Sequence, residues 1–96
     1  MDFEWDDAKN AANIAKHGIA FEDAKRVFDG FVVSSPDLRL EYGEDRIATT
    51  GKLDGIIVVV VIHTPRLDKQ RIISARRGNR REREAFEAAF LARLDS

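Results

Sequence analysis

The segment QRIISARRGNRRERE, residues 70–84, decides how the rest of the chain is arranged. Its first half is typical of a β-strand, with two isoleucines in the interior, and its second half is typical of a helix start. Gly78 interrupts the extended run, and Asn79 is a favourable residue for capping the helix. Glu82, three residues after Asn79, completes the sequence pattern of a capping box. The segment therefore predicts a strand that turns sharply into a helix.

Arginines crowd this strand-to-helix corner. Its six arginines are Arg71, Arg76, Arg77, Arg80, Arg81 and Arg83. Arginine keeps its charge and presents a planar fork of donors that suits phosphate. Period-two alternation predicts that Arg71 and Arg77 share one face of the sheet and that Arg76 lies on the other. The helix dipole disfavours cations at a helix start, so Arg80, Arg81 and Arg83 should not stabilise the fold there. Binding to a polyanion or to an acidic partner explains their position better. A solvated charged surface is the alternative.

Length and composition predict a single domain over residues 1–96 in a soluble, cytoplasmic protein. With 44% hydrophobic residues among 96, the chain can form a core. The absence of cysteine excludes disulfides and thiolate metal sites, and we expect neither a metal nor a cofactor. The acidic N-terminus is unlike a signal peptide, and the longest apolar run, Ile56 to Ile62, is too short to span a membrane.

Charge is strongly polarised along the chain, although its formal net value is only −1. Residues 1–45 hold eleven acidic and five basic side chains, whereas residues 66–83 hold two acidic and eight basic ones. A chain of this kind can present one strongly positive surface despite a neutral total. Such a surface would suit RNA or an acidic protein partner.

The residue pattern predicts an α+β fold, in which an antiparallel sheet is packed by two N-terminal helices and one C-terminal helix. We expect a short extended entry around Phe3 and Trp5, helices at 7–16, 21–29 and 80–94, and strands at 31–34, 46–50, 56–63 and 69–77. Turns are expected at 35–37 and 64–68, and a polar loop at 38–44. Seven consecutive β-branched residues begin at Ile56, which indicates a central strand buried on both faces. Along the last helix, Phe86, Ala89, Phe90 and Leu94 share a face that should pack on the sheet.

Two histidines are candidates for proton transfer, because histidine titrates near neutral pH. His63 ends the central strand, and His17 follows the first helix, although either could be purely structural. No glycine-rich phosphate loop, nucleophile signature or metal-ligand cluster is present. Arginine, lysine and histidine suit RNA cleavage by the substrate's own 2′-hydroxyl, which needs a proton acceptor, cations for the phosphorane and an acid for the leaving oxygen.

Four motifs, in order along nearly the whole chain, resemble the BrnT toxin family. They are FEWDDAKNAANIAKHGIAFEDAKRVF at 3–28, GEDR at 43–46, HTPR at 63–66 and RIISARRGNRRERE at 71–84. The resemblance implies an α+β fold similar to RelE-type toxins and a ribonuclease activity that blocks translation. It also implies a small antitoxin that binds DNA and represses the shared operon, and it is compatible with a toxin homodimer inside the complex.

The resemblance has three departures, at Asp7, at Ala20 and at Gly78-Asn79, where the family more often has proline, a serine-like cap, and alanine with a hydroxyl residue. The first two concern helix starts, and the third leaves the placement of Arg77 open. The expected catalytic residues are His63, Arg77, Arg76 and His17. The expected substrate-binding residues are Arg71, Arg46, Lys16, Arg80 and Arg81.

The leading hypothesis is therefore a metal-independent endoribonuclease of a type II toxin–antitoxin pair. One rival is a non-catalytic RNA-binding module, which would explain the arginines without a histidine and would bind in a steeply salt-dependent way. Another is a protein-interaction domain whose basic surface meets an acidic partner.

Overall fold

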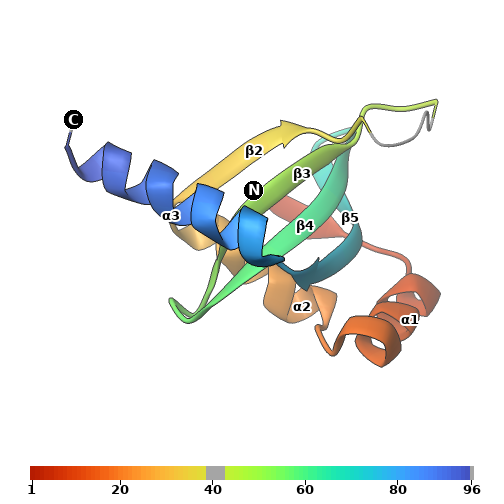
Figure 1. Ribbon diagram of the computed structural model, residues 1–96. Helices are drawn as coiled ribbons and strands as arrows, with labels where there is room; N and C mark the ends of the chain where they lie inside the picture. Colours follow the sequence, from red (N-terminus) through yellow and green to blue (C-terminus); the bar gives the residue numbers. More distant parts are fainter. Residues whose placement is uncertain (39–42, 96) are drawn as a thin grey trace.

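A computed structural model describes residues 1–38 and 43–95 and confirms the predicted α+β class (Figure 1). Its elements in chain order are β1 (Asp2–Glu4), α1 (Asp7–His17), α2 (Phe21–Ala24), the 3₁₀ helix η1 (Lys25–Asp29), β2 (Val32–Pro36), β3 (Ile47–Leu53), β4 (Ile57–Arg66), β5 (Lys69–Arg77) and α3 (Arg80–Leu94). The five-stranded sheet has the order β1-β5-β4-β3-β2. Strands β2 to β5 pair antiparallel, and the short β1 adds a parallel pairing to β5. Helices α1 and α2 lie on one side of the sheet and α3 lies on the other.

The strand β4 runs through the middle of the sheet, and its residues 58–64 are buried. On one face, Val59 and Val61 pack with Phe21 of α2 and Val27 of η1 in the main hydrophobic core. Burial of β-branched side chains on both faces of a central strand is what the apolar run predicted. We call the side that carries α1 and α2 the closed face.

Helix α1 is attached to the sheet mainly by one polar side chain. Its start and stop are as predicted, because the Asp6 carboxylate accepts the Lys9 N–H and Gly18 has a left-handed φ of 72°. The buried Asn13 amide donates to the Ala75 carbonyl at 2.8 Å and accepts from the Ala75 N–H at 3.1 Å. Strand β1 pairs with β5 only as far as Arg71, so Asn13 replaces the missing neighbouring strand at Ala75.

The second predicted helix, over residues 21–29, divides into α2 and the tighter η1. Ala20 provides no side-chain cap, which agrees with its poor capping propensity. Asn10 of α1 takes that role, because its side-chain oxygen accepts the Phe21 N–H at 2.9 Å. The first half of α1 is thereby joined to the start of α2.

Helix α3 begins with the capping box that the sequence predicted, formed in both directions between Asn79 and Glu82. Phe86 is buried, and Phe31, Phe86 and Phe90 form a cluster with ring centroids 5.7–6.5 Å apart. The prediction that Leu94 also packs on the sheet is wrong, since Leu94 is 59% exposed and the last turns of α3 extend beyond the strands (Figure 1). We call this side of the sheet the open face.

Two prolines that were expected in turns lie inside strands. Pro36 pairs with Ile47 at the end of β2, and Pro65 pairs with Gln70 near the end of β4. Proline has no N–H to donate, which a strand tolerates where that side has no hydrogen-bonded neighbour. Pro36 is on the edge strand β2, and Pro65 lies beyond the last β3–β4 pair, Ile47 with His63. The β4–β5 turn is therefore tighter than predicted, and residues 39–42 of the expected polar loop lie outside the described part of the chain.

A register irregularity in β5 changes which side chains share a face. Ile62 pairs with Ser74 and His63 with Ile72, which leaves Ile73 without a cross-strand partner. Residues directly opposite each other on paired strands project to the same face of the sheet. Arg71 lies opposite Thr64 and Arg76 lies opposite Val60. Thr64 and Val60 are four residues apart on β4 and therefore share a face, so Arg71 and Arg76 share that face as well. The predicted grouping of Arg71 with Arg77 is therefore wrong, because a single unpaired residue shifts the alternation by one.

Candidate active site

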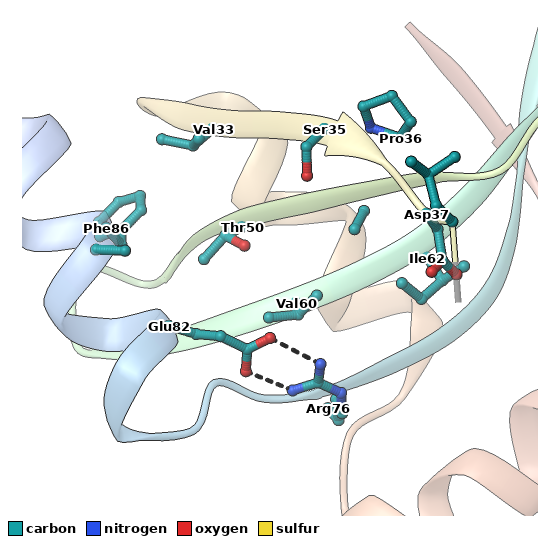
Figure 2. Close-up of a pocket in the computed structure, with 13 residues that line it drawn as sticks. Val33, Ser35, Pro36, Asp37, Thr50, Val60, Ile62, Arg76, Glu82 and Phe86 are labelled. Atoms are coloured by element: carbon teal, nitrogen blue, oxygen red, sulfur yellow. Dashed lines mark hydrogen bonds and ion pairs between the residues drawn. The ribbon is translucent and has the colours of Figure 1, made fainter.

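A hollow of about 550 Å³ lies on the open face, between the first turns of α3 and the strands β2, β3, β4 and β5. Apolar side chains, including Val60 and Ile62 of β4, line its base (Figure 2). Ser35 and Asp37 lie on the β2 side, and Arg76 and Glu82 lie opposite them. The hollow thus combines an apolar base with facing polar groups, the usual composition of a ligand site.

The polar centre of the hollow is a two-pronged ion pair between Arg76 of β5 and Glu82 of α3. The two guanidinium nitrogens donate to the two carboxylate oxygens at 2.7 and 2.8 Å. Both side chains are 29% exposed, so the pair is half-buried yet reachable. Glu82 also accepts the Asn79 N–H at 2.8 Å, so the helix cap fixes its position.

Sequence reasoning treated Glu82 only as a cap and missed this second contact. A signal was present, because an arginine at the end of a strand and the capping glutamate of the next helix are brought together by a tight corner. The neighbouring arginine, Arg77, lies on the other face of the sheet and away from this pair. Arg77 lies opposite Val59 of the closed face, whereas Arg76 lies opposite Val60 of the open face.

The Arg76 fork is suited to exchange one anion for another. A guanidinium binds carboxylate and phosphate with the same parallel pair of hydrogen bonds. A phosphate that takes the fork would release the Glu82 carboxylate beside it. The arrangement therefore offers a phosphate site and a proton acceptor within one side-chain pair.

Arg46 lies next to this hollow and not in it. It lines an adjoining cavity of about 700 Å³ that shares Ser35, Pro36 and Asp37 with the first. The two sides are linked through the backbone, because the Asp37 N–H donates to the Arg46 carbonyl at 2.8 Å. Asp37 itself is buried. Arg46 is thus placed to contact a substrate that extends beyond the hollow.

Arg71 shares the open face with Arg76 but is engaged elsewhere. Its Nε donates to the Glu4 carboxylate of β1 at 3.0 Å, and about a third of each side chain is exposed. It does not line the hollow. Its ion pair joins β1 to the sheet, and a substrate would have to compete with Glu4 for it.

His63 is buried on the closed face, only 4% exposed, away from Arg76. Its Nε2 lies 2.7 Å from the Thr49 hydroxyl, and its Nδ1 lies 2.8 Å from the side-chain amide oxygen of Gln70. Burial lowers the pKa of His63, and the hydrogen bond to Gln70 partly opposes that change. With both ring nitrogens bonded to protein groups, this geometry suits a neutral, structural imidazole better than a proton carrier.

A polar line crosses the buried side of four strands through His63. The Ser34 hydroxyl of β2 lies 2.7 Å from the Thr49 hydroxyl of β3, which continues to His63 of β4 and Gln70 of β5. These groups satisfy one another inside the sheet, as buried polar groups must. Phe28 of η1 covers the imidazole edge-on, at 5.1 Å between ring centroids.

Lys16 and His17 lie at the C-terminal end of α1, away from the residues that line the hollow. Lys16 is exposed and His17 is half-buried. Cations at this position stabilise a helix through its dipole, so their presence is explained without a substrate. The structure does not bring them to Arg76.

The remaining predicted cations surround the corner. Arg80 pairs with Glu84 at 2.9 Å, and Arg81 is exposed at the start of α3. Arg77 is exposed at the end of β5, where it lines a separate hollow. Within residues 1–38 and 43–95, no group of three or more His, Cys, Asp or Glu side chains could hold a metal ion. No helix in this part of the chain is long and apolar enough to cross a membrane.

Comparison with known proteins places the chain in a family. The family model described as "Ribonuclease toxin, BrnT, of type II toxin-antitoxin system" matches residues 5–82. The chain belongs to the BrnT family. A solved relative is the ribonuclease toxin BrnT of Brucella abortus, known from a crystal structure at 1.1 Å resolution. Its fold matches with a TM-score of 0.62 and 29% sequence identity, over 83% of this chain and 99% of that one. A comparison with curated proteins finds no match.

Family membership confirms the predictions of the fold class and of a ribonuclease toxin in a type II toxin–antitoxin system. An antitoxin partner follows from that membership. The non-catalytic alternatives are therefore set aside, and the remaining question is which side chains perform the cleavage.

Proposed function

We propose that this BrnT-family toxin cleaves RNA in the open-face hollow, with Arg76 holding the scissile phosphate and Glu82 accepting the proton of the neighbouring 2′-hydroxyl. The observation that supports it is the bidentate Arg76–Glu82 pair at the edge of an accessible hollow. This choice differs from the sequence-based one, which gave the proton to His63 or His17.

In the proposed reaction the phosphate displaces Glu82 from the Arg76 fork. The 2′-oxygen attacks phosphorus while its proton passes to the Glu82 carboxylate. The bond to the 5′-oxygen breaks, and this oxygen takes a proton from a water in the open hollow. The hydroxide that remains takes the proton from Glu82, which restores the carboxylate. The products are a 2′,3′-cyclic phosphate and a 5′-hydroxyl end, so atoms and charge balance without a metal.

Arg76 stabilises this reaction electrostatically. The pentavalent phosphorane carries more charge on its non-bridging oxygens than the ground state does, and a fixed guanidinium favours the more highly charged state. Nearby cations extend the binding surface, with Arg46 on one side and the exposed Arg80 and Arg81 on the other. Cutting RNA in this way would block translation in the cytoplasm.

The antitoxin is proposed to act by covering the same surface. It would bind DNA through its own fold and repress the shared operon, and toxin chains would pair within the complex. Its contact with the toxin would bring acidic groups to the arginines of the corner, because like RNA it must match their charge.

The test is RNA cleavage by purified Glu82→Gln protein in the presence of a chelator. Glutamine retains the capping box but accepts no proton, so helix α3 should persist. Cleavage should fall by roughly 10²–10⁴-fold, the usual contribution of a general base. The matched control is Glu84→Gln, two residues further on α3, where the exposed pair with Arg80 lies outside the hollow. Equal cleavage by Glu82→Gln and wild type would overturn the proposal, and loss of wild-type cleavage in chelator would refute its metal independence.

A further inference from the structure

A second hollow, of about 430 Å³, lies beside the same corner, at the ends of β4 and β5. Its basic wall comes from Arg77 of β5, Arg83 of α3 and Lys52 of β3. The other lining residues are Ile56, Ile57, Val58, Gly78 and Glu87. Neither Lys52 nor Arg83 was among the residues expected to bind substrate.

The charge of this hollow is positive. Lys52 pairs with Glu87, at 2.6 Å between ammonium and carboxylate. Neither Arg77 nor Arg83 forms an ion pair with a carboxylate in the described part of the chain. Two uncompensated guanidinium groups therefore face one small volume. In the first hollow, by contrast, Arg76 is matched by a carboxylate, so an anion entering there must displace Glu82.

Hydrogen bonds to the backbone fix the corner at Gly78 and hold the Arg83 side chain against it. The Gly78 N–H donates to the Val58 carbonyl at 2.9 Å, and Arg83 donates to the Gly78 carbonyl, also at 2.9 Å. A Cβ at Gly78 would lie 3.0 Å from a Val58 methyl, so glycine permits this close approach. The bond from Arg83 uses one of the five guanidinium donors and leaves the planar group positioned for an anion.

The two hollows lie on either side of one corner. Arg76 and Arg77 are adjacent on β5 and project to opposite faces, and Glu82 and Arg83 are adjacent on α3. A single RNA strand that crosses the corner can place one phosphate in each hollow. The exposed Ile56, at 79% relative accessibility, adds an apolar surface against which a sugar or base can pack.

We propose that Arg77, Arg83 and Lys52 form a second phosphate-binding subsite, which holds the RNA backbone beside the scissile phosphate. The location of the scissile phosphate rests on the proposed function, whereas the anion preference of the second hollow rests on its own charge. The subsite makes the toxin bind a strand of several nucleotides better than a dinucleotide, because only the longer strand reaches both hollows.

The experiment measures the affinity of wild-type toxin, Arg77→Gln and Arg83→Gln for uncleavable 2′-O-methyl RNA, as a dinucleotide and as a decamer. Each substitution should weaken decamer binding about tenfold, since a hydrogen bond between charged groups is lost. The slope of log affinity against log salt should fall by about 0.7 for each phosphate contact removed from a single strand. Dinucleotide binding should change less, because a single phosphate cannot occupy both hollows at once. Lys9→Gln, which removes one exposed charge from α1, should bind both RNAs as wild type does.

Wild-type decamer affinity and salt slope in both folded arginine variants would overturn the subsite. So would RNA binding that is unchanged while binding of the cognate antitoxin weakens, because the hollow would then be a protein-binding surface. Glu82→Gln separates this proposal from the previous one. It should bind the decamer at least as tightly as wild type does, because phosphate no longer competes with a carboxylate for Arg76, and it should fail to cleave ordinary RNA. Full cleavage by Glu82→Gln would refute the first hollow alone.

Discussion

The two faces of the sheet differ in how completely helices cover them. On the closed face, α2 and η1 bury Phe21, Ala24 and Val27 against the strands, and even the polar His63 is shielded from solvent. On the open face, α3 packs through its phenylalanines and leaves a hollow beside its first turn. Charged side chains that line an accessible hollow can meet a substrate, whereas a buried histidine cannot.

Under the proposed mechanism, this difference assigns stability to one face of the sheet and RNA cleavage to the other. Strand β4 contributes alternate residues to both faces, so one strand serves the core and the base of the hollow. Substitutions on the closed face should therefore change the free energy of unfolding. Those on the open face should change cleavage.

The largest stability effect is expected from Phe21→Ala. Phe21 is fully buried in the closed-face core, so truncation should lower the free energy of unfolding by about 3–5 kcal/mol. Val33→Ala on the open face should cost less than about 1 kcal/mol, because Val33 is already 37% exposed. Urea unfolding of both variants measures the contrast, and equal losses would show that the faces do not differ in packing.

Arg76→Lys should have the next largest effect, on activity. Lysine keeps the charge but lacks the planar fork, so the phosphorane loses a bidentate contact. Cleavage should fall by roughly 10²–10³-fold, as when one donor to a developing oxyanion is removed. Single-turnover cleavage of a defined RNA measures this, and Arg66→Lys, in an exposed pair with Glu44 away from the hollow, is the control. Undiminished cleavage by Arg76→Lys would show that the bidentate guanidinium contact does not stabilise the transition state.

The sequence predicted the elements whose signals are local. The β-branched run predicted the central strand β4. Asp6 and Gly18 predicted the two ends of α1, and the Asn79–Glu82 capping box predicted the start of α3. These features depend on neighbours within a few residues, so a single chain suffices to find them.

Features set by contacts between distant segments were not predictable in the same way. The unpaired Ile73 is defined only by the register of β4, and it reversed the expected grouping of the arginines. Asn13 likewise acquires its role from Ala75, far along the chain. The motifs therefore pointed to the segment that contains the proposed site, while the choice of the Arg76–Glu82 pair within it needed the structure.

Asn13→Ala should have an intermediate effect, again on stability. It would leave the N–H and carbonyl of Ala75 without their partner at the edge of β5, at a cost of about 1–3 kcal/mol. Amide hydrogen exchange should increase at Ala75 while β4 stays protected. Unchanged exchange at Ala75 would mean that another group replaces the Asn13 amide.

The smallest effect concerns acid stability. Because the folded-state pKa of His63 lies below its ordinary value of 6.5, the unfolded chain binds the proton more readily. The stability contributed by neutral His63 should therefore be present above about pH 6.5 and be lost as the pH falls towards the folded-state pKa. Urea midpoints between pH 7 and pH 5 should decrease more steeply for wild type than for His63→Gln, and identical slopes would contradict the burial of a neutral imidazole.

The most direct measurement compares RNA cleavage by Glu82→Gln and His63→Gln at pH 7, each corrected for the folded fraction. The account predicts that Glu82→Gln loses roughly 10²–10⁴-fold in rate and that folded His63→Gln cleaves at a rate close to wild type. The opposite result, with cleavage lost in folded His63→Gln and retained in Glu82→Gln, would place the chemistry on the closed face and contradict the account.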